Sequence, residues 1–123
     1  MLFDTHAHYD DSWFDADRDE LLTALPDSGV GCVVDPGCDL PSSRTAVMLA
    51  DKYSHVYAAV GIHPENCADY EPAMLDELRT LVRENKKVVA IGEIGLDYHW
   101  EDENTPREKQ QRCCGINWHW RRN

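Results

Sequence analysis

The sequence is poor in basic residues: its 12 Lys and Arg stand against 23 Asp and Glu, for a formal net charge of -11. An acidic surface repels phosphate backbones, so this deficit argues against a scaffold that binds nucleic acid through a basic patch. It leaves a nucleic-acid enzyme open, because bound divalent cations would reverse the local field of an acidic site.

Long apolar runs, a leader and paired cysteines are also missing. No apolar stretch approaches the roughly 18 residues of a membrane span. Met1–Phe3 runs directly into Asp4, without the basic and apolar regions of a signal peptide. Five cysteines, an odd number with no CxxC pair, indicate reduced thiols and not a cysteine zinc site. We therefore expect a cytoplasmic protein with no membrane partner.

The chain does contain a regular alternation of strand and helix patterns. Its 42% of hydrophobic residues are enough for the core of one small domain. Strands are expected at residues 1–5, 32–34, 56–60 and 88–91, and helices at 15–26, 42–53, 74–82 and 107–111. This order predicts a parallel sheet with helices outside it. The fourth strand shows no polar alternation, so we expect both of its faces to be covered. Ser42 or Ser43 is the expected N-cap of the second helix.

Chemically useful side chains follow the expected strands at their C-terminal ends. They are His6 and His8, Asp35, His63 and Glu93. Active sites of barrels and open α/β sheets form at this edge, so it is the predicted place of function.

The first motif is DTHAH, at residues 4–8. If the first strand continues through it, alternation places Asp4, His6 and His8 on one face. Two imidazoles at this spacing can bind one cation, and Asp4 can accept an N–H bond that orients a ring. Because HxH arises often by chance, two exposed histidines near a chain end are the alternative.

Two more motifs end the third and fourth strands. In GIHPE, Pro64 turns the chain away after His63, whose imidazole can donate to a phosphate or carbonyl oxygen. In GEIGLDYH, Glu93 follows an apolar strand directly, and burying a carboxylate there is costly unless it is paired or binds a metal. A structural histidine and an acid emerging into solvent are the alternatives. Taken together, the three motifs suit a divalent cation with nitrogen and oxygen ligands.

The set DTHAHYD, VGIHPE, GEIGLDYH and PREKQQ, in this order over residues 1–111, resembles the N-terminal half of the TatD family of metal-dependent deoxyribonucleases. The family is similar to the amidohydrolases, and the resemblance implies a TIM (β/α)8 barrel holding one or two divalent metal ions. A full barrel needs about 250 residues, so we expect an α/β fold with a partial barrel of about four βα units. Magnesium is the expected metal, and manganese and zinc are alternatives.

The resemblance also implies roles for individual residues. His6 and His8 match the first-strand metal ligands, and Glu93 matches a catalytic carboxylate that bridges two metals. His63 matches the histidine near the scissile phosphate, a catalytic and substrate-binding residue. Supporting roles are expected for Asp4, Asp97 and Tyr98. The family has two further histidines and a late aspartate, from strands beyond the fourth, which have no counterpart here.

The implied activity is metal-dependent hydrolysis of ester bonds, with DNA as substrate and a metal-activated water as nucleophile. Because the later ligands are missing, we expect turnover to be impaired. A deacylase acting on aminoacyl-tRNA is an alternative on the same scaffold. A second alternative is a non-catalytic half-barrel that binds metal weakly or folds only as a homodimer through its open barrel edges. A third is a pseudogene product that does not fold.

Residues 112–123 differ in composition from the rest of the chain. They contain no acid and no Leu, hold two of the four Trp and two of the five Cys, and show no helical period. Arg, Cys, Gly and Trp are typical of G-rich codons read out of frame. We therefore divide the chain into a barrel-type domain at 1–111 and an anomalous tail at 112–123, with a frameshift or truncation after about Gln111. A short divergent tail is the alternative.

Overall fold

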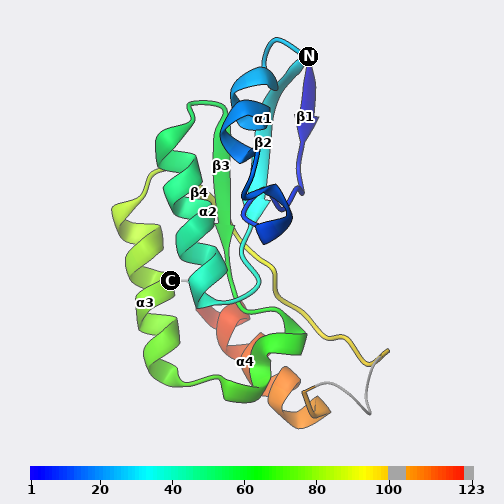
Figure 1. The fold of residues 1–123 in the computed structure, drawn as a ribbon. Helices are drawn as coiled ribbons and strands as arrows, with labels where there is room; N and C mark the ends of the chain where they lie inside the picture. The colour runs from blue at the N-terminus through cyan, green and yellow to red at the C-terminus, as the bar shows by residue number, and fades with distance from the viewer. Residues whose placement is uncertain (100–104, 121–123) are drawn as a thin grey trace.

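The computed structural model of the chain describes residues 1–99 and 105–120, apart from the side chains of 117–120. Strands and helices alternate along it (Figure 1), which confirms the predicted α/β class. The elements are β1 Leu2–Asp4, η1 Ser12–Phe14, α1 Arg18–Ala24, β2 Val30–Pro36, α2 Leu40–Lys52, β3 Val56–Val60, η2 Pro64–Asp69, α3 Pro72–Glu84, β4 Val88–Ile91 and α4 Arg107–Trp120.

The four strands form one parallel sheet in the order β1-β2-β3-β4. Parallel neighbours need a crossover connection, and here α1, α2 and α3 lie between successive strands. The three helices stand on the same side of the sheet in Figure 1. All four strands therefore point the same way, and their C-terminal ends meet at one edge.

The hydrophobic core lies between the sheet and these helices. α2 packs on β2 and β3, and α3 packs on α2 and β3. Fully buried side chains from both layers fill the interface, among them Leu22, Val33, Ala46, Val56, Val60 and Leu78. This close packing fixes the strands, so the loops that follow them start from fixed positions.

The start of α2 differs from the prediction. Asp39, and neither Ser42 nor Ser43, is the N-cap: its Oδ1 accepts the backbone N–H of Ser42 at 2.8 Å, and Ser42 Oγ accepts the N–H of Asp39 at 3.0 Å. This reciprocal capping box satisfies two exposed donors at once. Pro41 fits the first turn because no intrahelical N–H is needed there. Ser43 instead hydrogen-bonds Gly61, next to the end of β3.

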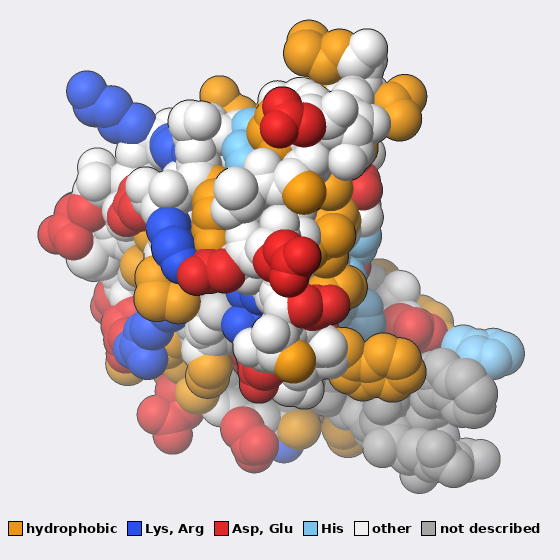
Figure 2. Space-filling model, turned by 45° about the horizontal axis from the view of Figure 1, so that its top comes forward, with side chains coloured by type: hydrophobic (Ala, Val, Ile, Leu, Met, Phe, Trp, Pro, Cys, Tyr) orange, Lys and Arg blue, Asp and Glu red, His pale blue; other side chains and the backbone are white. Residues whose placement is uncertain are grey.

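The expectation that both faces of β4 are covered is wrong for the described residues. Val89 is 54% exposed, and Ala90 is also exposed. β4 is the last strand of the described sheet, where Val88 and Ile91 pack against the core while Val89 and Ala90 stay exposed. The other edge strand, β1, also exposes Leu2 and Phe3, and hydrophobic side chains are visible on the surface in Figure 2. The unpaired backbone groups of an edge strand can pair with another chain. The predicted homodimer through the open barrel edges stays a prediction.

The last helix begins after Pro106, as predicted, but it does not stop at Gln111. α4 continues to Trp120, through residues whose sequence shows no helical period. Cys113 is buried in the core, and α4 packs on η2. The predicted boundary after Gln111 and the origin of the tail stay predictions, and residues 121–123 lie outside the described part. No helix of the described residues is long and apolar enough to cross a membrane.

Candidate metal centre

The loop after β1 carries the two histidines of the first motif. β1 ends at Asp4, within the strand expected at residues 1–5, so strand alternation does not place Asp4, His6 and His8 on one face. The Asp4 carboxylate accepts the backbone N–H of His6 at 3.1 Å, and the N–H of Ala7 donates to the carbonyl of Val34 at 3.1 Å. Asp4 therefore shapes the turn that presents the histidines. Its carboxylate accepts a backbone N–H, whereas we expected it to accept the N–H of an imidazole ring.

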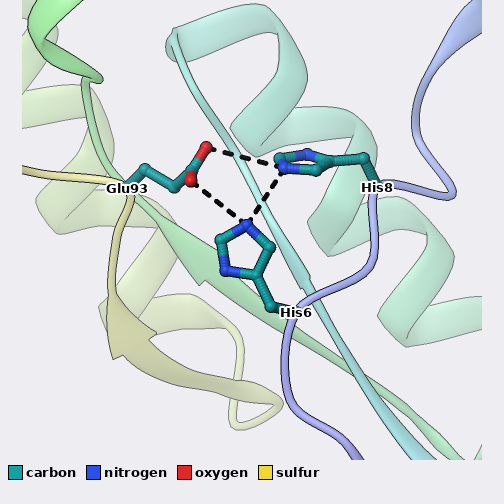
Figure 3. A group of neighbouring side chains, drawn as sticks. All are labelled: His6, His8 and Glu93. Atoms are coloured by element: carbon teal, nitrogen blue, oxygen red, sulfur yellow. Dashed lines mark hydrogen bonds and ion pairs between the residues drawn. The ribbon is translucent and has the colours of Figure 1, made fainter.

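The two imidazoles meet the carboxylate of Glu93, which follows β4 (Figure 3). His6 Nε2 lies 3.1 Å from Glu93 Oε1, and His8 Nε2 lies 3.6 Å from Glu93 Oε2. The two Nε2 atoms are 3.2 Å apart, with the rings edge to face. Three residues separated by up to 87 positions thus present two nitrogens and a carboxylate to one point.

This donor set fits a divalent cation. Ligand atoms bonded about 2.1 Å from one ion lie roughly 3.0–3.5 Å apart, close to the spacings of His6, His8 and Glu93. Two imidazole nitrogens with a carboxylate suit Mn²⁺, Zn²⁺ or Mg²⁺. A hydrogen bond between the two rings requires one of the facing Nε2 atoms to carry a proton, whereas a cation would be bound by the lone pairs of both.

Backbone and side-chain contacts from the end of β2 hold Glu93 in place. Its N–H donates to the carbonyl of Gly37 at 2.8 Å, and the thiol of Cys38 donates to its Oε2 at 3.0 Å. Burial and the neighbouring carboxylate raise the pKa of the Cys38 thiol, which therefore stays protonated as a donor. Cys38 was not predicted as a site residue, because its place next to Glu93 depends on the pairing of strands far apart in sequence.

His63 lines the same groove as His6 and Glu93. It caps η2 after β3, and its Nδ1 accepts the N–H of Glu65 at 3.3 Å. The groove has a volume of about 510 Å³, and His6, Glu93 and Asp97 also line it. A neutral imidazole that accepts at Nδ1 carries its proton on Nε2, so His63 can donate to an oxygen in the groove.

The loop after Glu93 is anchored to α4. Gln110 is fully buried, accepts the N–H of Asp97 and donates to its carbonyl, each at 2.8 Å. Tyr98 lies under the guanidinium of Arg107, 4.4 Å from the ring centre, and its hydroxyl accepts from Gln111. The supporting roles expected for Asp97 and Tyr98 stay predictions. Gln110 was not predicted, because a buried glutamine in PREKQQ has the sequence pattern of an ordinary helix start.

A second group of potential ligands lies beside the first. His8, Asp10 and Asp35 have ligand atoms within 4.8 Å of one another, and His8 Nδ1 is 3.6 Å from Asp10 Oδ1. Asp35, on β2, is completely buried, and burial followed by repulsion from Asp10 raises its pKa to about 8. Its place near a strand end was visible in the sequence, but its burial against Asp10 was not.

Known proteins that are similar to this chain belong to one family. The family model described as "TatD related DNase" matches residues 3–114. An uncharacterized metal-dependent hydrolase, YabD of Bacillus subtilis, is 38% identical over 111 residues, which are 90% of this chain and 42% of YabD. The 3'-5' ssDNA/RNA exonuclease TatD of Klebsiella pneumoniae is 35% identical over 109 residues, 89% of this chain and 41% of that protein.

Solved structures show the same relationship. The TatD homologue YJJV of Escherichia coli K12 superposes with a TM-score of 0.84 at 33% identity, over 96% of this chain and 45% of its own. A TatD family hydrolase of Entamoeba histolytica gives a TM-score of 0.88 at 25% identity, over 98% of this chain and 46% of its own. The chain spans less than half the length of these relatives, which confirms the predicted partial barrel. The chain belongs to the TatD-related DNase family, of which it matches the N-terminal half.

Proposed function

We propose that this chain serves metal-dependent hydrolysis of DNA phosphodiester bonds, with His6, His8 and Glu93 as ligands of a divalent cation. The observation that carries the proposal is the convergence of two Nε2 atoms and one carboxylate within 3.1–3.6 Å at the C-terminal edge of the sheet. A bound divalent cation supplies Lewis-acid chemistry toward a phosphoryl oxygen and activates water at neutral pH. Magnesium is the proposed metal, with manganese and zinc as alternatives.

The residues around this centre have distinct tasks in the proposal. Glu93 binds the cation while Cys38 and the Gly37 carbonyl fix its orientation. His63 donates from Nε2 to a non-bridging phosphate oxygen in the groove it shares with Glu93. Asp97 and Tyr98 keep the loop after Glu93 in place through α4.

The relatives support a nucleic-acid substrate. The Klebsiella protein is named a 3'-5' ssDNA/RNA exonuclease, whereas YabD is named only a metal-dependent hydrolase. The net charge of -11 repels a phosphodiester, so the cation is also needed to attract the substrate. The family's later ligands lie outside the matched half, so we propose that turnover by this chain is impaired.

Metal binding is tested first, by titrating the chain with Mn²⁺ in a calorimeter. The double variant His6→Ala/His8→Ala is expected to lose the heat of the proposed site. Glu93→Gln keeps the size of the side chain and removes the charge, so it is expected to bind at least about 100-fold more weakly, since outer-shell changes alone cost about 10–100-fold. Equal heats for the wild-type chain and the double variant would exclude DTHAH as a metal site.

The substrate is tested under single-turnover conditions with Mg²⁺ or Mn²⁺. Metal-dependent cleavage of single-stranded or duplex DNA, lost in Glu93→Gln, is the expected result. Intact DNA together with cleaved aminoacyl esters would favour the deacylase alternative. Metal binding without cleavage of either substrate would favour the non-catalytic alternative.

A further inference from the structure

Two carboxyl groups are buried beside the proposed metal centre, and three of their oxygens have no hydrogen-bond partner among the described residues. Asp35 is 0% exposed, and neither of its carboxyl oxygens has a hydrogen-bond partner among the described residues. The Asp10 side chain is 10% exposed, and its buried Oδ1 is also without such a partner. A buried carboxylate is costly unless it is hydrogen-bonded, paired or bound to a metal. Three unsatisfied oxygens at one place therefore call for a ligand.

The nearby arginine does not supply the missing charge. Arg18 Nε and Nη2 donate to the carbonyl oxygens of Tyr9, Asp10 and Asp11, and Nη2 also binds the Asp15 carboxylate. Its guanidinium thus holds the backbone of the loop and not the buried carboxyl oxygens.

His8 stands between these acids and the first centre. Its Nδ1 is 3.6 Å from Asp10 Oδ1, whereas its Nε2 is 3.6 Å from Glu93 Oε2 on the other side of the ring. Ligand atoms of His8, Asp10 and Asp35 lie within 4.8 Å of one another, a span that one cation can draw together. The ring therefore connects two neighbouring groups of ligands.

We propose that Asp10 and Asp35 form a second divalent-cation site, separated from the His6–His8–Glu93 site by the imidazole of His8. Carboxylate ligands completed by water favour Mg²⁺ or Mn²⁺. This position differs from the two-metal centre that the family resemblance implies, where Glu93 bridges the ions and later strands complete the site. The second site does not depend on hydrolysis at the first.

The shared histidine sets how the two sites interact. A neutral imidazole has one free lone pair, so His8 can ligate only one ion. When Nε2 serves the first site, Nδ1 carries the proton and donates toward Asp10, while the two carboxylates hold the second ion. A change at His6 therefore affects only the first site, a change at Asp35 affects only the second, and a change at His8 affects both.

The test is Mn²⁺ binding to the full chain, followed by the electron paramagnetic resonance signal of free Mn²⁺. The wild-type chain is expected to show two binding sites, of which His6→Ala weakens only one. Asp10→Asn and Asp35→Asn remove a charge without changing the shape of the side chain. Each is expected to weaken Mn²⁺ binding at the second site by at least about 10–100-fold. Asp27→Asn, an exposed acid in the turn before β2, is the matched control and keeps both sites.

Each outcome decides the proposal. Unchanged binding in both Asp10→Asn and Asp35→Asn would overturn it, because the acids would then share a proton in place of an ion. Loss of all Mn²⁺ in His6→Ala would overturn it as well, while leaving the proposed hydrolase intact. Conversely, a single Mn²⁺ site that is lost with Asp35 and is insensitive to His6 and Glu93 supports the second site and counts against the first. Circular dichroism checks the fold, and Asp10→Asn, in a loop, carries the test if Asp35→Asn unfolds.

Discussion

The thiol of Cys38 donates a hydrogen bond to Glu93 Oε2 at 3.0 Å, although the two residues are 55 positions apart in the sequence. Cys38 follows β2 and Glu93 follows β4, so the bond spans the C-terminal end of β3 between them. The same carboxylate faces both His6 and His8. The thiol is therefore an outer partner that orients a candidate metal ligand.

Cys38→Ala removes this donor and is expected to weaken Mn²⁺ binding at the His6–His8–Glu93 site by about 10-fold, the lower end of the range for outer-shell partners. Cys38→Ser keeps a hydroxyl donor and is expected to bind nearly as tightly as the wild-type chain. Calorimetry measures both. Cys114→Ala, on α4, is the control for a cysteine away from the site. Equal losses in Cys38→Ala and Cys38→Ser would show that the hydrogen bond is not the cause.

Gln110 joins the loop after Glu93 to α4. Its side chain makes three hydrogen bonds of 2.8 Å, to the N–H and carbonyl of Asp97 and to the carbonyl of Thr105, and it is fully buried. Gln110→Ala leaves these backbone groups without partners and is expected to lower the free energy of unfolding by about 1–3 kcal/mol. Urea denaturation monitored by circular dichroism measures the change.

The neighbouring Gln111 provides the matched control for this prediction. It is exposed and makes one hydrogen bond, to the hydroxyl of Tyr98. Gln111→Ala is expected to change the free energy of unfolding by no more than about 0.5 kcal/mol, as for other surface substitutions. If both variants were destabilised equally, burial of Gln110 would not be the reason for its effect.

Gly61 allows the backbone that precedes Glu93 to approach the end of β3. A Cβ at Gly61 would lie 2.7 Å from the carbonyl carbon of Gly92 and 2.8 Å from the carbonyl oxygen of Glu93. Because these neighbours are backbone atoms, they cannot rotate away. Gly61→Ala is therefore expected to destabilise the fold by about 1–3 kcal/mol and to weaken Mn²⁺ binding by moving Glu93.

The control for Gly61 is Gly115, in α4, where an added Cβ would meet nothing within 4 Å. Gly115→Ala is expected to stabilise the chain by about 0.5–1 kcal/mol, since alanine is the better helix former. Thermal melts and Mn²⁺ titrations of both variants make the comparison. Wild-type Mn²⁺ affinity in Gly61→Ala would contradict the close approach as a determinant of the site.

The sheet and the residues at its C-terminal edge could be predicted from the sequence. Val56–Val60 is a strand with the predicted bounds, because an apolar run between turn signals has few other solutions. His6, His8 and Glu93 meet because parallel strands bring their C-terminal ends to one edge. Their predicted roles as ligands stay a prediction that the titrations address.

The features that the sequence did not reveal depend on tertiary packing. Burial makes Asp35 unusual, yet its immediate neighbours look like any strand end that leads into a turn. Cys38 becomes a partner of Glu93 only through the parallel pairing of β2, β3 and β4. The covering expected over β4 was inferred from its apolar sequence alone, which cannot show whether another element packs there.

Asp35 gives the metal-free chain a distinctive pH dependence. Its pKa is about 8 in the folded chain, against an ordinary value of 3.8, because burial, followed by repulsion from Asp10, opposes its charge more than Arg18 favours it. The imidazole of His8 also faces this group. Between these two values the folded chain holds a proton that the unfolded chain has released. The stabilising contribution is therefore complete below about pH 4 and is lost as the pH rises to about 8.

Asp35→Asn carries no titrating proton, so its stability lacks this decline. In the presence of a chelator, the free energy of unfolding of the wild-type chain should fall relative to that of Asp35→Asn by up to about 1.4 kcal/mol per pH unit across this window. Urea titrations at several pH values measure the difference in free energy of unfolding between the two chains. The contributions of the other acids cancel in this difference because both chains contain them. Asp27→Asn should run parallel to the wild-type chain. A difference between wild type and Asp35→Asn that does not change with pH would mean that Asp35 is already ionised in the fold, and that its burial is compensated by another group.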